Sequence, residues 1–305
     1  MSSYQRIKSK IEAGKLVVLD GGTGTDLQRR GVPMCGEVWC ALANLSHGND
    51  VRAVHSDYID AGADIITANT YASSPVSFSE LGRTAEIEPI DRAAVRLARE
   101  AAEGSKTAIA GSISVMPAIA EGTDRVGDVP CDPAELKPLY RRKAEILADA
   151  GCDLLIMEMM QDLEVSLWAT EAAVATGLPV WVGMSAEADD DGALLSHSNH
   201  RWTLAELVTG LMATGGDLAL IMHNDVDITS AALETIAGNW DGPFGAYPEA
   251  GHFEMPNWVF KDISPDDFAA ACRDWHAAGA CVLGGCCGTT PAHIAALADA
   301  LASRR

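Results

Sequence analysis

The sequence predicts a (β/α)8 barrel. Eight short apolar segments recur along the 305 residues, and longer segments with helical periodicity separate them. The short segments are apolar almost throughout, which is typical of parallel strands that are buried on both faces. A doubly wound open sheet is the alternative arrangement for the same alternation. We expect one barrel domain that spans residues 1–305.

The expected strands follow one another at regular intervals. They cover residues 16–19, 64–68, 107–110, 154–157, 180–182, 218–222, 244–246 and 281–283. Runs of this length that are rich in valine, isoleucine and leucine favour buried strands.

The expected helices show apolar residues at steps of three and four, most clearly at residues 87–103. Others are expected at residues 138–150, 163–176 and 291–302. Glycine follows several of these segments, as it commonly does just past a helix end. The segment 203–240 is the least regular, because Gly215 and Gly216 interrupt its helical pattern.

Composition limits the classes of partner. The chain has 22 basic and 43 acidic residues, a net charge of −21, and such a surface repels phosphate backbones and anionic lipids. No apolar run is long enough to span a membrane, and residues 1–15 lack the apolar core of a secretory signal. Eight cysteines are too few for a disulfide scaffold. We therefore expect a cytoplasmic protein without nucleic-acid or membrane partners; a homo-oligomer is compatible with the sequence.

The barrel hypothesis places the chemistry at the C-terminal ends of the strands and in the loops that follow them. Those positions are polar or rich in glycine, and the candidate site residues there are Asp20, Gly21, Gly22, Asn69, Tyr71, Ser112, Glu158, His223, Asn224, Asp225, Tyr247, Cys286 and Cys287. The loop at residues 20–25 lacks the spacing and the lysine of a phosphate-binding loop. We interpret it as a backbone-lined loop in which Asp20 can meet a cationic group.

Cys286 and Cys287 are the strongest candidates for metal ligands. Neighbouring glycines permit the sharp turn that brings two adjacent thiols to one ion. Two thiolates suit zinc, and a catalytic zinc needs about three protein ligands. Asp225 is the candidate third ligand, with His223 as its alternative. The competing interpretations are two small buried side chains in a tight turn, and an Asn-Asp pair that makes turn hydrogen bonds.

Glu158 ends an apolar strand, where a carboxylate is costly to bury without a partner. It could hold the ammonium group of a substrate, or form a salt bridge with an arginine from a neighbouring strand. His55 is interpreted as a structural histidine on a helix. The remaining cysteines show no ligand spacing and are expected to be inert: Cys35, Cys40, Cys131, Cys152, Cys272 and Cys281.

Several motifs together resemble one known family. GGCCGTTPAHI at residues 284–294 resembles the C-terminal signature of the homocysteine S-methyltransferases, which include betaine–homocysteine and S-methylmethionine–homocysteine methyltransferases. LDGGTGTDLQRRG at residues 19–31 and HSDYIDAGADIITANTYAS at residues 55–73 resemble earlier blocks of the family. GSI, AGCDLLIMEM and YPEAG follow in the family's order, at residues 111–113, 150–159 and 247–251.

This resemblance implies a (β/α)8 barrel in which zinc holds homocysteine as a thiolate. The thiolate attacks the methyl group of a small sulfonium or ammonium donor. By the same resemblance Cys286 and Cys287 are zinc ligands, Asp20 and Glu158 hold the amino group of the acceptor, and Tyr71 lies near the donor. The implied substrate contacts are Gly21, Gly22, Asn69, Ser112, Asn224 and Tyr247.

The sequence departs from the family pattern at two places. Where the family has Asn-Cys after the sixth strand, this chain has Asn224-Asp225, and the family's Tyr-Pro-Asn is Tyr247-Pro248-Glu249 here. Two alternatives follow. One is a divergent enzyme that uses another acceptor, or that demethylates or hydrolyses its substrate at an altered metal site. The other is a non-catalytic protein that binds a small ligand.

Overall fold

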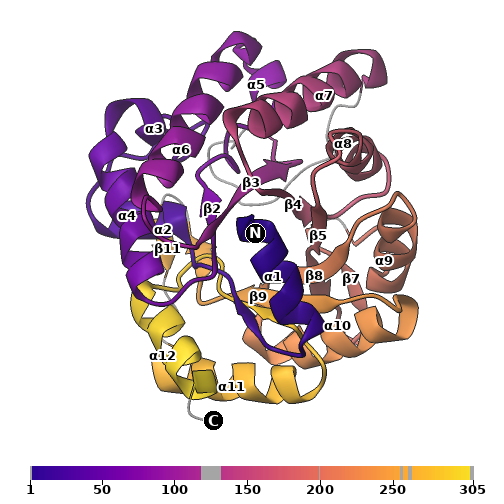
Figure 1. Ribbon diagram of the computed structural model, residues 1–305. Coiled ribbons are helices and arrows are strands. Elements are labelled where there is room, and N and C mark those ends of the chain that lie inside the picture. The colour runs from indigo at the N-terminus through magenta and orange to yellow at the C-terminus, as the bar shows by residue number, and fades with distance from the viewer. Residues whose placement is uncertain (1, 118–131, 199, 255–256, 260–262, 303–305) are drawn as a thin grey trace.

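The computed structural model describes residues 2–117, 132–198, 200–254, 257–259 and 263–302. Eight parallel strands form one sheet in the order β1-β12-β9-β8-β5-β4-β3-β2 (Figure 1). These strands are β1 (Val17–Val18), β2 (Ile65–Ala68), β3 (Ala108–Ser114), β4 (Leu154–Met160), β5 (Val180–Met184), β8 (Leu218–Asp225), β9 (Phe244–Glu249) and β12 (Val282–Leu283). All eight overlap segments expected from the sequence, and β3, β4, β8 and β9 extend about three or four residues further at their C-terminal ends.

The first and last strands of this order meet at a seam that closes the sheet into a barrel. Leu19 pairs with Ile65 in a parallel bridge. Below the bridge, the Asp64 backbone N–H donates to the Val18 carbonyl (2.8 Å), and the Val18 N–H donates to the Asp64 carboxylate (3.0 Å). The closed arrangement confirms the (β/α)8 barrel and excludes the open sheet.

Helices surround the barrel, and α1 lies across its centre in Figure 1. They are α1 (Ser3–Glu12), α2 (Thr23–Arg29), α3 (Ala43–Ser46), α4 (Gly48–Asp60), α5 (Pro75–Glu80), α6 (Ile87–Ala101), α7 (Pro133–Ala150), α8 (Val165–Val174), α9 (Leu204–Met212), α10 (Val226–Asn239), α11 (Pro265–Ala277) and α12 (Pro291–Ala302), with a 3-10 turn η1 (Thr84–Glu86). Within the described ranges, none of the helices has the length and apolar character needed to cross a membrane.

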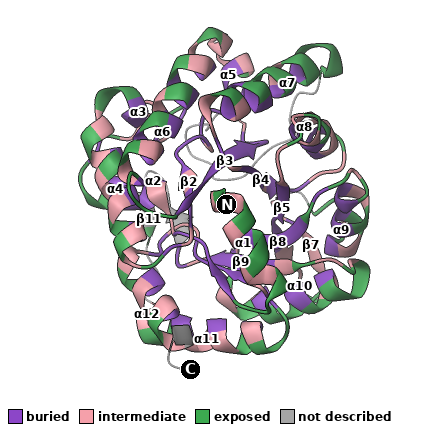
Figure 2. Ribbon diagram, in the orientation of Figure 1, coloured by how far each residue is buried: buried purple, intermediate pink, exposed green. Residues whose placement is uncertain are grey.

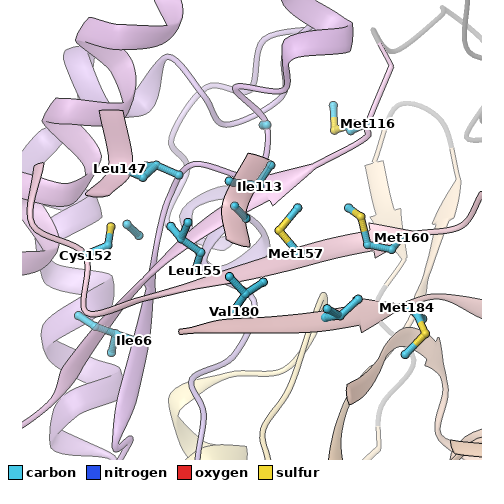
Figure 3. Close-up of a cluster of buried hydrophobic side chains, with 14 of the residues drawn as sticks. Ile66, Ile113, Met116, Leu147, Cys152, Leu155, Met157, Met160, Val180 and Met184 are labelled. Carbon is cyan, nitrogen blue, oxygen red and sulfur yellow. The ribbon is translucent and has the colours of Figure 1, made fainter. Parts of the chain in front are cut away.

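The strands separate two apolar clusters. Leu154 and Ile156 of β4 face the barrel interior, whereas Leu155 and Met157 face the surrounding helices. Figure 3 shows Leu155 beside Leu147 of α7 in the outer cluster. Because both faces are buried, successive residues are apolar, and Figure 2 shows the strands buried within a ring of helices whose outer faces are exposed.

The N-terminal helix closes one end of the barrel interior. Ile7 of α1 is fully buried and belongs to the inner cluster. The indole N–H of Trp181, which also faces the interior, donates to the Tyr4 hydroxyl (3.3 Å). Arg6 forms an ion pair with Asp64 (2.8 Å), so α1 is attached beside the seam.

Two helical regions differ from expectation. Helix α7 begins at Pro133, not at residue 138, because the Asp132 carboxylate caps the Ala134 N–H (2.8 Å) and proline suits the first turn. The irregular segment 203–240 contains both α9 and α10, and Gly215 adopts φ +108 between α9 and β8.

Two short hairpins add to the barrel. They are β6 (Ala186–Ala188) with β7 (Leu194–Ser196), and β10 (His252–Glu254) with β11 (Asn257–Val259). Each pair is antiparallel and follows a barrel strand, β5 or β9. The hairpins therefore extend the loops at the end of the barrel where the expected site lies.

The close approach of β12 to Gly245 of β9 allows the strand packing to be tested. A Cβ atom there would lie 2.0 Å from the Val282 carbonyl oxygen of β12, and backbone cannot yield to it. We expect Gly245→Ala to lower the free energy of unfolding by roughly 3 kcal/mol or more. The control is Gly238→Ala in α10, which has open space around it and should gain about 0.5–1 kcal/mol. Urea unfolding measures both, and equal midpoints for Gly245→Ala and the native chain would contradict the packing.

His55 should make stability depend on pH. It is fully buried, neither ring nitrogen has a hydrogen-bond partner among the residues that the structure describes, and burial lowers its pKa to about 4. Between pH 6.5 and about 4 the unfolded chain takes up a proton that the folded chain does not, so stability falls as pH falls, by up to about 1.4 kcal/mol per pH unit. His55→Leu lacks this loss. Between pH 7 and pH 5, the urea midpoint of the native chain should therefore fall further than the midpoint of His55→Leu. Equal falls in the two proteins would contradict the expectation.

Candidate metal centre and substrate site

The inward-facing rows of the barrel strands end in polar residues. On β4, Leu154 and Ile156 face the interior, and Glu158 is the next residue of that row. On β3, Ser112 follows Ala110 in the same way. The Ser112 hydroxyl donates a hydrogen bond to the Glu158 carboxylate. The alternation that fills the interior therefore directs both polar side chains to the C-terminal mouth.

Two carboxylates lie at this mouth, the buried Asp20 and the half-buried Glu158. Asp20 accepts hydrogen bonds from the Thr67 backbone N–H (2.7 Å) and hydroxyl (3.0 Å). Burial raises the pKa of Asp20 to about 8, opposed by these bonds and assisted by the Glu158 charge. Burial also raises the pKa of Glu158, against the hydrogen bond from Ser112. Across the described part of the chain, neither acid is paired with lysine or arginine, so both are placed to receive a cation.

Cys286 and Cys287 follow β12 in a tight turn against the loop after β1. A Cβ atom on Gly22 would lie 2.7 Å from the Cys286 carbonyl oxygen, so glycine is required for this approach. Gly288 adopts φ +81, and a Cβ atom there would lie 1.8 Å from the Ala250 carbonyl oxygen. These close contacts fix the turn that the glycines of the sequence predict.

His223 of β8 joins the two thiols. The possible ligand atoms of His223, Cys286 and Cys287 all lie within 4.8 Å of one another. The His223 Nδ1 atom is 3.6 Å from the Cys286 Sγ atom. A nitrogen and a sulfur bound to one tetrahedral zinc, at about 2.0 and 2.3 Å, are separated by about 3.5 Å. The spacing in the cluster therefore fits a shared ion.

A distortion at the end of β8 turns His223 toward the thiols. The register against β9 shifts between Met222 and Asp225, and His223 adopts φ +47. The Ser185 hydroxyl donates to the His223 carbonyl (3.1 Å) and supports this conformation. Bulges beside active sites commonly redirect a side chain, and a positive φ at a residue other than glycine costs of order 1–3 kcal/mol.

Asp225 lies elsewhere. It is exposed at the N-terminus of α10, and it does not belong to the cluster formed by His223 and the thiols. The Asn224 amide donates to the Asp225 carbonyl (2.8 Å) and to the Thr229 hydroxyl (2.9 Å), which secures the start of α10. Because of the bulge, the structure brings the alternative candidate His223, and not Asp225, to the thiols.

Glu249 is a site residue to which the sequence analysis assigns no role. Its Oε2 atom lies 2.9 Å from His223 Nδ1. Burial alone would lower the pKa of His223, but the charge of Glu249 and the contact with Cys286 raise that pKa well above its ordinary value. The available signal was the Tyr-Pro-Glu departure at residues 247–249. Its significance depends on strand pairing, which places Asp225 opposite Glu249.

Aromatic side chains surround the acids and the thiols. The pKa of Tyr71 is raised, first by burial and then by the charges of the nearby thiols and of Glu158. The pKa of Tyr247 is raised by burial and by the neighbouring charges of Glu158 and Cys286. Trp39 packs edge-on against Tyr71, with ring centroids 6.5 Å apart. The two tyrosines are therefore part of the same site.

Lys143 of α7 anchors the loop after β2. Its fully buried Nζ atom lies 2.9 Å from the Asp91 carboxylate of α6. The ammonium group also donates to the backbone carbonyls of Thr70 (3.0 Å) and Ser73 (3.1 Å). Tyr71 lies between these two anchoring points, so a buried ion pair outside the barrel fixes the backbone that presents it.

Other candidates have structural contacts. The Asn69 amide donates to the Cys40 carbonyl (3.1 Å) and the Asn44 side chain (3.0 Å). A Cβ atom on Gly21 would lie 2.7 Å from the Thr289 hydroxyl oxygen. Cys131 lies outside the described residues. Burial raises the thiol pKa, which disfavours the reactive thiolate, at Cys40, Cys152, Cys272 and Cys281.

Comparison with known proteins agrees with this geometry. The chain is 30% identical to homocysteine S-methyltransferase 4 of maize, Zea mays, over 95% of this chain and 90% of the relative. It is 28% identical to the homocysteine S-methyltransferase of Escherichia coli, over 97% of this chain and 99% of that one. The metallated crystal form of the homocysteine methyltransferase MmuM from Escherichia coli superposes with a TM-score of 0.76 at 28% identity, covering 93% of this chain and 96% of that one.

A sequence profile gives the family directly. The profile described as homocysteine S-methyltransferase matches residues 17–301, almost the whole chain. The match includes every barrel strand, both carboxylates at the mouth and the paired cysteines. The chain is therefore a methyltransferase that belongs to the homocysteine S-methyltransferase family.

Proposed function

We propose that this methyltransferase moves a methyl group from a small sulfonium or ammonium donor, such as S-methylmethionine or a betaine, to homocysteine or a related thiol. One observation carries the proposal: three possible zinc ligands converge beside two acids that form no ion pair with lysine or arginine among the described residues. An amino-acid thiol offers both complementary groups, a sulfur for a metal and an ammonium for the acids.

We assign a zinc site to His223, Cys286 and Cys287. Two thiols and an imidazole are common zinc donors, and three protein ligands leave a fourth position open for a substrate atom. When bound, zinc stabilises the thiolate form of a coordinated thiol at neutral pH. The 3.6 Å separation of His223 Nδ1 and Cys286 Sγ supports this assignment.

Asp20 and Glu158 bind the ammonium group of the acceptor in this proposal. Burial favours their protonated forms, so an arriving ammonium group would favour ionisation and bind as an ion pair. Thr67 and Ser112 already donate hydrogen bonds to the two carboxylates and hold their orientation. The acids therefore orient the acceptor rather than transfer the methyl group.

Trp39 and Tyr71 form the donor side of the proposed site. Their edge-on packing leaves an aromatic wall near the thiols, and aromatic faces attract onium groups. Methyl transfer needs the donor methyl in line with the acceptor sulfur. The Lys143 anchor supports a fixed position of Tyr71 for that alignment.

We also propose that residues 1–305 act as one barrel domain in the cytoplasm, without nucleic-acid or membrane partners. The seven cysteines of the described residues are free thiols, which suits a reducing compartment. The net charge of −21 opposes binding to phosphate backbones and anionic lipids.

Metal analysis tests the proposed site. The purified protein should contain about one zinc per chain, and Cys286→Ala should lose it together with methyl transfer to homocysteine. The matched control is Cys281→Ala, whose thiol contacts the Phe244 carbonyl at the opposite end of the strand and which should retain the metal. Zinc that persists in Cys286→Ala would refute the site. Zinc without transfer from any onium donor to any thiol would instead favour the altered-chemistry alternative.

Removal of one acid tests the acceptor pocket. Glu158→Gln should raise KM for homocysteine about 10- to 100-fold, because a charged hydrogen bond to the ammonium is lost. The matched control is 4-mercaptobutanoate, the acceptor analogue that lacks the amino group. Its KM should not respond to the substitution. An equal loss with both thiols in steady-state assays would mean that Glu158 does not recognise the ammonium group.

A further inference from the structure

Glu249 lies beside the thiols because of backbone pairing on both sides of it. The Cys286 N–H donates to the Pro248 carbonyl (2.9 Å), and the Ala250 N–H donates to the Cys287 carbonyl (2.7 Å). The segment that carries Glu249 is thus held against the segment that carries both cysteines. Its position does not depend on a mobile side-chain contact.

Among the described residues, the partner of the Glu249 carboxylate is the imidazole of His223, which is itself a candidate metal ligand. Its Oε2 atom is buried and forms no hydrogen bond with the described residues. It lies 2.9 Å from His223 Nδ1, a distance that suits an ion pair, but the contact is not aligned as a hydrogen bond. The same Nδ1 atom faces the Cys286 thiol at 3.6 Å. A buried carboxylate oxygen without a hydrogen bond is costly unless it meets a cation.

Charge supports the same assignment. Two thiolates and a carboxylate beside a neutral imidazole are anionic groups that attract a divalent cation.

Resting on the proposed function, we infer that Glu249 belongs to the metal centre and acts together with His223 to hold the ion. Glu249 lies outside the cluster of His223, Cys286 and Cys287 and adjoins it through the contact with His223 Nδ1. Carboxylate is an ordinary oxygen ligand of zinc, so Glu249 adds an anionic donor on the imidazole side of the cluster. The carboxylate thereby strengthens binding of the ion.

Zinc affinity of the metal-free protein tests this assignment. We expect Glu249→Gln to weaken zinc binding about 10- to 100-fold in competition with a chromophoric chelator. His223→Ala should weaken it as well. The double variant should lose much less than the product of the two single losses, because the two residues act together. Circular dichroism of the metal-free variants checks that they are folded, and the visible spectrum of the cobalt(II) form should change in Glu249→Gln.

Asp225→Asn is the matched control. It removes the same charge from the residue paired with Glu249 across the strands, and it should bind zinc as the native chain does. If Glu249→Gln binds zinc as tightly as the native chain, or if only Asp225→Asn loses zinc affinity, the inference about Glu249 is wrong. The proposed methyl-transfer function would be unaffected by either result. Absence of zinc uptake by the native chain would overturn both proposals. Weakened zinc binding as expected, with no methylation of thiols, would refute only the proposed function.

Discussion

Closure of the barrel between β1 and β2 depends on one backbone bridge and two carboxylates. Leu19 and Ile65 form the bridge, Asp64 bonds to the backbone on one side of it, and Asp20 bonds to Thr67 on the other. The position of β1 sets the loop that follows it, and the turn at the two cysteines packs against that loop. Asp20 therefore has two roles, since its carboxylate bonds across the seam and also lies at the mouth of the barrel.

Much of the fold follows from the sequence because each barrel strand is buried on both faces. Residues 154–157 alternate between the inner and outer clusters. Both environments are apolar, so the run of apolar residues is uninterrupted. The same alternation explains why the place of Glu158 at the mouth could be predicted, since it is the next inward position after Ile156. The paired cysteines were also predictable, because only a glycine-rich turn lets both thiols face one point.

The remaining features depend on contacts between distant segments. The sequence alone does not reveal the bulge that turns His223 inward and leaves Asp225 exposed. Asn69 and Asn224 occupy strand ends as expected, but their amides bond to neighbouring segments that no local pattern identifies. Glu249 gains its significance only when β8 and β9 are placed side by side.

The bulge of β8 also separates the chemistry of the site from the stability of the barrel. The pairing with β9 is regular up to Met222 and is resumed at Asp225, so the distortion is confined to the intervening residues. The side chain of His223 can therefore be exchanged without repacking the two apolar clusters below it. A scaffold of this kind can acquire a different set of metal donors through a few substitutions at strand ends, while its folding determinants stay the same.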